Sequence, residues 1–131
     1  MEYRSFVAVG DSFTEGLDDA HPDGTGYRGW ADLVAARLAR QTPGFGYANL
    51  AVRGRLFDSV VDQQVPAASR MRPDLISFAA GGNDVLRRSF AAGPMLSRFD
   101  QTIGGLRSAG SQVVLFRFAD VTRRLPGRRI T

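Results

Sequence analysis

The sequence predicts an α/β fold, a three-layer, doubly wound parallel sheet with helices on both faces. Three of its four strand-like segments are near-continuous apolar runs, which is typical of strands buried on both faces. Helical patterns alternate with these segments along the chain, and such alternation favours a parallel sheet. The four predicted strands are Phe6–Gly10, Tyr47–Val52, Leu75–Ala80 and Val113–Phe118.

Apolar residues recur at helical spacing in the segments between the predicted strands. One pattern lies within residues 30–38, a shorter one within 60–65 and a long one within 95–106. Pro66 should break the short helix, because proline has no N–H to donate and its ring crowds the preceding turn. Gly110 should end the long helix before the last strand.

The composition describes a globular chain of one domain, residues 1–131. Of these 131 residues, 44% are hydrophobic and 23% are charged, which separates the chain from disordered proteins. No apolar run approaches the roughly 20 residues that span a bilayer, so we expect no membrane span. There is no cysteine, which excludes disulfides and thiolate metal sites. The five residues before the first strand leave no room for a signal peptide, which predicts a cytoplasmic location.

The distribution of charge argues against a nucleic-acid partner. All 17 basic residues are arginines, and four of them (Arg123, Arg124, Arg128 and Arg129) lie within the last nine residues. The remaining arginines equal the 13 acidic residues in number, so the body of the chain is neutral. Proteins that bind nucleic acid carry a basic face on the folded body. We therefore expect no nucleic-acid partner.

Small and polar residues follow the first three predicted strands. They are Gly10–Ser12, Arg53–Arg55 and Gly81–Asp84. Ligands of open parallel sheets bind beyond the carboxyl ends of the strands, so these three stretches should meet at one edge. Taken alone, each stretch is better explained by a helix cap or a turn, but their meeting at one edge favours a functional site.

These same stretches resemble the sequence blocks of a known enzyme family. The letters GDSFTEG (residues 10–16), NLAVRG (49–54) and GGND (81–84) are similar to the first three blocks of the GDSL, or SGNH, hydrolases. The letters RGWADLVAARL (28–38) resemble members of that family as well. The three blocks occur in the family's order, each after its own strand.

The resemblance implies a flavodoxin-like SGNH hydrolase fold with the strands in the order second, first, third, fourth, fifth. Four of these five strands are present here. It implies that Ser12 is the nucleophile, and that the N–H groups of Ser12 and Gly54 and the amide of Asn83 form the oxyanion hole. These residue types suit the chemistry, since an acyl-enzyme needs an exposed hydroxyl and donors aimed at the developing oxyanion. The implied substrate is a small-molecule carboxylic ester, and no cofactor is expected.

The general base is missing from this pattern. The family places an Asp-x-x-His block near its C-terminus, after a fifth strand, and this sequence has no such block. Its single histidine, His21, follows Asp18 at the right spacing but lies on the wrong side of the chain order. We therefore expect a C-terminally truncated domain that is inactive as it stands. Without a fifth strand, residues 113–118 would form an open sheet edge and favour self-association.

Two other functions fit the same fold. One is an interaction module on a hydrolase scaffold that has lost catalysis, and the other is a flavodoxin-like flavin-binding module. Nucleotide motifs are not supported. Residues 24–29 match G-x-G-x-x-G but follow no strand, and the P-loop lysine does not occur. The nucleophile elbow G-x-S-x-G of α/β-hydrolases is also absent, because Thr14 occupies the position of its second glycine.

Overall fold

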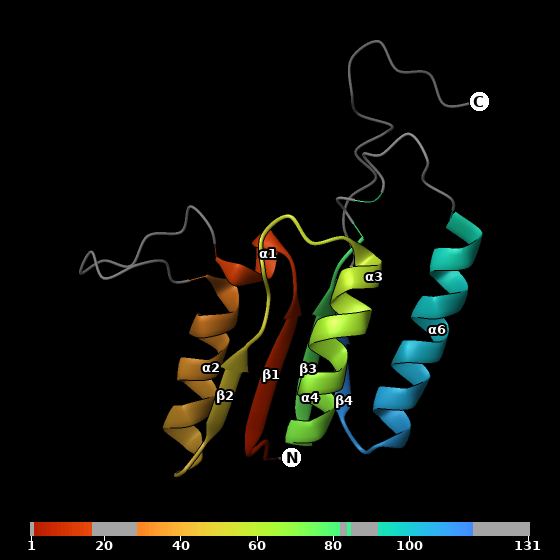
Figure 1. Ribbon diagram of the computed structural model, residues 1–131. Coiled ribbons are helices and arrows are strands. Elements are labelled where there is room, and N and C mark those ends of the chain that lie inside the picture. The colour runs from red at the N-terminus through yellow and green to blue at the C-terminus, as the bar shows by residue number, and fades with distance from the viewer. Residues whose placement is uncertain (1, 17–28, 82–83, 85–91, 117–131) are drawn as a thin grey trace.

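The computed structural model describes residues 2–16, 29–81, 84 and 92–116. It shows a four-stranded parallel sheet with helices on both sides, in the order β2-β1-β3-β4 (Figure 1). The strands are β1 (Ser5–Gly10), β2 (Gly46–Asn49), β3 (Leu75–Ala79) and β4 (Gln112–Leu115). The helices are α1 (Ser12–Glu15), α2 (Trp30–Gln41), α3 (Phe57–Ser59), the π-helix η1 (Val60–Gln64), α4 (Val65–Met71) and α6 (Ala92–Ser108). The predicted fold class and the order of these four strands are confirmed.

Alternate side chains of the central strands fill two separate cores, one on each face of the sheet. On one face, Val7 and Val9 of β1 pack in a cluster with Phe57, Val60 and residues of α6. On the other face, the neighbouring β1 residues pack against α2 in a second cluster (Phe6, Ala8, Ala31, Ala35 and Leu75). Because side chains alternate along a strand, a strand with helices on both faces needs apolar side chains on both faces. This explains the near-continuous apolar runs of β1 and β3, in which the buried Ser77 of β3 is the polar exception.

The prediction that Pro66 breaks its helix is wrong. α3, η1 and α4 form one continuous helical segment from Phe57 to Met71. The Val65 N–H donates to the carbonyl of Val60, five residues back, which is the spacing of a π-helix. Pro66 then occupies the first turn of α4, where a missing N–H costs little. The wider turn therefore accommodates the proline.

The long helix ends as the sequence predicts. α6 runs from Ala92 to Ser108, and Leu106 is its fully buried residue. Gly110 has φ 102°, and its N–H donates to the carbonyl of Arg107 at 3.0 Å. Across the described residues, no helix combines the length and the apolar character needed to cross a bilayer.

Strands β2 and β4 differ from their predicted extents. β2 ends at Asn49, although the N–H groups of Leu50 and Val52 still donate to carbonyls of β1. In β4, Val114 and Leu115 are 38% and 46% exposed, so the expectation of burial on both faces is wrong for this strand. Within the described ranges, β4 pairs with β3 alone, and α6 packs against it. The last two residues of the predicted strand, 117 and 118, lie outside the described part of the chain.

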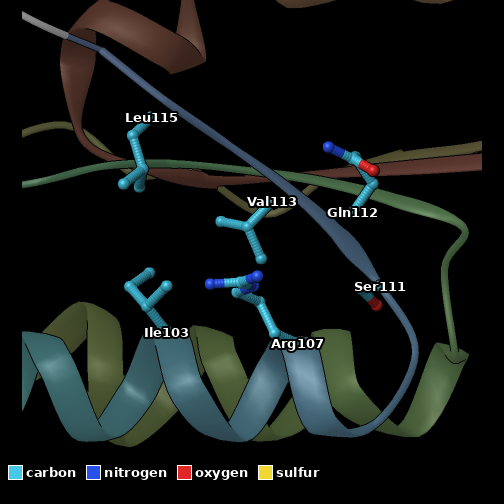
Figure 2. Close-up of a pocket in the computed structure, with 6 residues that line it drawn as sticks. All are labelled: Ile103, Arg107, Ser111, Gln112, Val113 and Leu115. Atoms are coloured by element: carbon cyan, nitrogen blue, oxygen red, sulfur yellow. The ribbon is translucent and has the colours of Figure 1, made fainter.

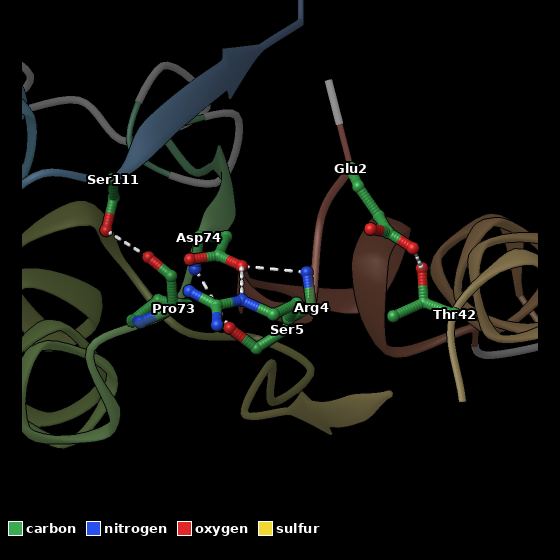
Figure 3. A network of polar contacts seen from close by, with 7 residues as sticks. All are labelled: Glu2, Arg4, Ser5, Thr42, Pro73, Asp74 and Ser111. Atoms are coloured by element: carbon green, nitrogen blue, oxygen red, sulfur yellow. Dashed lines mark hydrogen bonds and ion pairs between the residues drawn. The ribbon is translucent and has the colours of Figure 1, made fainter. Parts of the chain in front are cut away.

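Polar contacts connect the N-terminal ends of the strands, at the edge of the sheet opposite their carboxyl ends (Figure 3). The carboxylate of Asp74 accepts the Arg4 N–H at 2.7 Å, and the Asp74 N–H donates to the Ser5 hydroxyl at 2.9 Å. The Ser111 hydroxyl donates to the carbonyl of Pro73 at 2.7 Å, which ties the start of β4 to the start of β3. These bonds fix the starts of β1, β3 and β4 relative to one another, so the far ends of the strands are aligned as well.

The outer side of β4 should mediate self-association of the 131-residue chain. A pocket of about 270 Å³ lies between α6 and β4, where Figure 2 shows Arg107 below Val113. An exposed edge with apolar side chains favours pairing with another chain, and an added charge opposes it. Val114→Lys should therefore shift the chain from dimers or larger species toward monomers in light scattering at high concentration.

Leu33→Lys is the matched control, because Leu33 is a similarly exposed apolar residue on α2. It should leave the association unchanged. A wild-type chain that is monomeric at high concentration would contradict the prediction, and so would dissociation caused by Leu33→Lys instead of Val114→Lys.

Candidate active site

Ser12 lies at the carboxyl end of β1, where the strand turns directly into α1. Asp11 caps this helix, and its carboxylate accepts the Phe13 N–H at 3.3 Å. Its carbonyl accepts the N–H groups of Thr14 and Glu15 at 3.1 and 2.9 Å. Asp11 therefore ties down the turn between β1 and α1. Ser12 is the first helical residue and is partly exposed.

Gly10 lets the end of β1 come close to β3. A Cβ placed on Gly10 would overlap the carbonyl oxygen of Ala79, its partner in the parallel ladder. The φ of 153° is also one that side chains disfavour. Beside it, Thr14 of α1 is fully buried. The strand end, the turn and the short helix thus form one tightly packed unit that carries Ser12.

The charges of two carboxylates, Asp11 in the first sequence block and Asp84 in the third, act on each other. Burial raises the pKa of Asp11 above its ordinary range, and the nearby charge of Asp84 raises this pKa further. Hydrogen bonds to the Asp11 carboxylate oppose the rise without cancelling it. The carboxylate of Asp84 accepts the N–H of Phe57 at 2.8 Å, so it also fixes the start of α3. Asp84 therefore bonds to the segment that follows the second block, and its charge acts on the turn at Ser12.

Side chains of the first two blocks bond to each other directly. The Asn49 amide donates to the carbonyl of Thr14 at 2.9 Å, and its oxygen accepts the Ala51 N–H at 3.0 Å. Glu15 accepts both the backbone N–H of Arg53 and its guanidinium, with Nη2 at 2.8 Å. The residue after Arg53 is Gly54, so these bonds connect the helix of Ser12 to the turn of Gly54.

Gly54 is exposed and lies in a turn with φ 74°. No atom of the described residues lies within 4 Å of the place where a Cβ would be, so the left-handed backbone, and not lack of space, favours glycine there. An open position of this kind suits a backbone N–H that a ligand must approach. Ser12 and Gly54 therefore belong to neighbouring, mutually bonded segments at the same edge of the sheet.

Two residues of the predicted site lie outside the described residues. They are Asn83, the third predicted oxyanion donor, and His21, the only histidine of the sequence. The assignment of Ser12, Gly54 and Asn83 to one oxyanion hole therefore stays a prediction. The same holds for the expectation that His21 has no catalytic role.

The residues that hold the site together were not predicted from the sequence. Glu15 and Arg53 lie within the first and second blocks. Their opposite charges could have indicated that they pair, but their spacing in the sequence does not show that they meet. Gln64 was missed as well. It is 6% exposed and continues a buried series with Phe57, Val60 and Ala68, so it is a polar residue at a core position of a helix.

Comparison with known proteins identifies a family that matches nearly the whole chain. The profile described as the GDSL-like Lipase/Acylhydrolase family matches residues 8–130. The uncharacterized protein YpmR of Bacillus subtilis (strain 168) is 33% identical over 132 residues, covering 87% of this chain and 50% of that protein. The chain therefore spans about half the length of this curated relative.

Solved structures share the fold. The crystal structure of TesA superposes with a TM-score of 0.71 at 25% identity, covering 93% of this chain and 64% of that one. A member of the lipolytic protein G-D-S-L family from Veillonella parvula gives a TM-score of 0.66 at 19% identity. That match covers 94% of this chain and 63% of the other. The predicted resemblance to the GDSL, or SGNH, hydrolases is confirmed.

The raised pKa of Asp11 predicts a pH-dependent effect of Asp11→Asn. A carboxyl with a raised pKa binds its proton more tightly in the folded state than in the unfolded chain. Its contribution to the free energy of unfolding is therefore fully present below the ordinary Asp pKa of about 3.9 and is lost as the pH rises through the raised value. Asparagine keeps the capping oxygen and cannot ionise. Asp11→Asn should gain stability relative to the wild type as the pH rises from about 3 to about 7.

Urea unfolding at the two pH values measures this difference. Asp100→Asn, at an exposed position of α6, controls for the change in net charge. A stability difference between Asp11→Asn and the wild type that falls with rising pH would contradict the predicted sign.

The contacts of Glu15 predict that its removal costs more than removal of its partner side chain. The Arg53 side chain is 57% exposed, so the ion pair itself should contribute only about 0.2–1 kcal/mol. Glu15→Ala also frees the backbone N–H of Arg53, and should cost about 1–2 kcal/mol of unfolding free energy. Denaturant unfolding of the two variants and their double mutant checks this order. An Arg53→Ala cost equal to or above that of Glu15→Ala would show that the backbone bond contributes nothing.

Proposed function

The chain belongs to the GDSL-like lipase/acylhydrolase family, and on this premise we propose that it acts in the hydrolysis of carboxylic esters with Ser12 as the nucleophile. The observation that carries the proposal is the position of Ser12. It is the first residue of α1, immediately beyond the carboxyl end of a buried central strand. Bonds from the second sequence block and the charge of Asp84 converge on the same turn.

The proposed reaction has two steps. The Ser12 Oγ attacks the ester carbonyl carbon as a base takes its proton, and the alcohol leaves from an acyl-enzyme. Water then attacks the acyl group and regenerates the serine. In both steps the carbonyl oxygen becomes an oxyanion, which N–H donors in fixed positions stabilise. We assign this role to the N–H groups of Ser12 and Gly54 and to the amide of Asn83.

The base is proposed to lie in a C-terminal Asp-x-x-His segment. The only histidine of the 131 residues is His21, which precedes the second and third blocks. The chain also spans only half of YpmR and less than two thirds of TesA, so these relatives contain further sequence. A segment of this kind would supply the proton acceptor that Ser12 needs.

Measurable ester hydrolysis would distinguish a hydrolase from an interaction module that has lost catalysis. A scaffold that only binds a partner does not need a reactive serine, whereas ester hydrolysis depends on it. The family match supports the hydrolase over a flavodoxin-like flavin-binding module, because the matched family is one of lipases and acylhydrolases.

The 131-residue chain should hydrolyse a short-chain nitrophenyl ester poorly, and a chain extended through an Asp-x-x-His segment should be active. Loss of a triad histidine costs on the order of a millionfold in turnover. In the extended chain, Ser12→Ala should abolish the activity. Asn83→Ala should lower kcat by about a hundredfold to a thousandfold, the effect of removing one oxyanion donor.

His21→Ala is the control for a local base and should leave both chains unchanged. Equal turnover by the short and extended chains, together with its loss in His21→Ala, would place the base at His21. An extended chain that is folded but shows no activity dependent on Ser12 would favour the interaction module.

A further inference from the structure

The side chain of Gln64 binds both backbone groups of Gly10. Its Oε1 accepts the Gly10 N–H at 2.8 Å, and its Nε2 donates to the Gly10 carbonyl at 2.9 Å. The two bonds require this orientation of the amide, since the flipped one would oppose donor to donor and acceptor to acceptor. Gln64 is 6% exposed, so the bonds form away from water, where an unmade bond is costly.

The bonds occur where the backbone ladder beside β1 ends. β2 ends at Asn49, which pairs with Ala8, two residues before Gly10. Beyond that point the Val52 N–H reaches the Gly10 carbonyl at 3.2 Å, and the N–H of Gly10 is taken by Gln64. The amide of Gln64 offers one donor and one acceptor, as a peptide group does. It therefore takes the place of the neighbouring strand for the Gly10 N–H and adds a second donor to the Gly10 carbonyl.

Helical spacing explains how Gln64 comes to face this residue. η1 spans Val60–Gln64 within the helical segment that packs against β1 and β3 (Figure 1). Phe57, Val60, Gln64 and Ala68 follow one another at intervals of three or four residues, which places them on one face of the helical segment. Phe57, Val60 and Ala68 are buried apolar residues. Gln64 is the polar member of this series, and it is the one that bonds to β1.

Gly10 is separated from Ser12 by the single residue Asp11. Asp11 caps α1, and Ser12 begins it, so a shift in the Gly10 peptide moves the nucleophile with it. The other side of Gly10 is already constrained by the contact with Ala79. The turn is thus held from two sides, by close packing against β3 and by the glutamine amide.

We propose that Gln64 is a positioning residue of the ester hydrolase site, and that its amide fixes the Gly10 peptide so that the Ser12 hydroxyl is aimed at the substrate carbonyl. The proposal rests on the proposed role of Ser12. It gives the glutamine no contact with substrate. Misplacement of a reacting group by about 1 Å can cost a hundredfold in rate, so the effect should fall on kcat and leave KM unchanged.

Two substitutions test the amide. Gln64→Met keeps nearly the same shape but removes both bonds, and should lower kcat of the extended chain by about tenfold to a hundredfold. Gln64→Glu keeps the acceptor for the Gly10 N–H, but as a carboxylate it opposes the Gly10 carbonyl. Protonation of the introduced carboxylate would restore the missing donor. The ratio of the kcat of Gln64→Glu to that of the wild type should therefore rise toward one as the pH falls.

Val60→Ala is the matched control. Val60 is fully buried in the same π-helix and its side chain has no bond to Gly10, so its truncation should lower thermal stability without changing kcat of the folded enzyme. If Val60→Ala and Gln64→Met lower kcat equally at equal loss of stability, Gln64 is only part of the core. A Gln64→Glu activity ratio that does not change with pH would also overturn the proposal.

A second measurement does not depend on activity. In a ¹⁵N-labelled 131-residue chain, the Gly10 amide should be protected from hydrogen exchange, and Gln64→Met should remove this protection. The Ser12 amide signal should shift in Gln64→Met and stay in place in Val60→Ala. An unmoved Ser12 signal would refute the positioning role. Absence of Ser12-dependent hydrolysis in the extended wild-type chain would instead refute the proposed function, and the exchange measurement would still decide the role of Gln64.

Discussion

The close approach of β1 and β3 at Gly10 is the constraint on which the site depends. Only glycine leaves room for the Ala79 carbonyl at this point, and the packing continues into the buried Thr14 of α1. The chain must then leave the sheet within one residue, and Asp11 caps the helix that follows. The hydroxyl of Ser12, the next residue, therefore lies at a strand–helix junction and not in a loop. Rigid placement of this kind is what catalysis by a serine requires.

The contacts around this turn differ in what they contribute. The exposed ion pair of Glu15 and Arg53 stabilises little by itself, and its value lies in joining the Gly54 turn to α1. The buried amide of Gln64 matters more, because its loss would weaken the bonding of two backbone groups in an apolar setting. Asp84 has a mixed effect. It fixes Phe57 through a hydrogen bond, and its charge adds to the rise that burial causes in the pKa of Asp11.

Much of the fold could be predicted from the sequence because burial on both faces leaves a clear pattern. Phe6–Val9 had to be apolar throughout, Leu75–Ala79 is apolar except for the buried Ser77, and Gly110 had to end a helix before β4. Pro66 led to a wrong prediction, because proline is unfavourable in an α-helix and the sequence does not reveal a π-helical turn before it. The burial of β4 was wrongly predicted too, since an apolar run does not report whether a neighbour covers it. The sequence predicted at which edge of the sheet the site lies, but not which contacts hold its residues in place.

Strand ends brought Ser12 and Gly54 to one edge, as parallel topology requires. Contacts between segments distant in sequence, such as Gln64 with Gly10, depend on the direction of single side chains and leave only a weak trace in the pattern. A polar residue at a core position was that trace.

The central claim is that this turn presents Ser12 as a nucleophile. The most direct test is reaction of the chain, extended through an Asp-x-x-His segment, with a fluorophosphonate probe, followed by tryptic digestion and mass spectrometry. The peptide from Ser5 to Arg28 contains both Ser5 and Ser12, and its fragment ions separate the two. The account predicts a single adduct on Ser12. An adduct on another residue, or a folded protein that remains unlabelled, would contradict it.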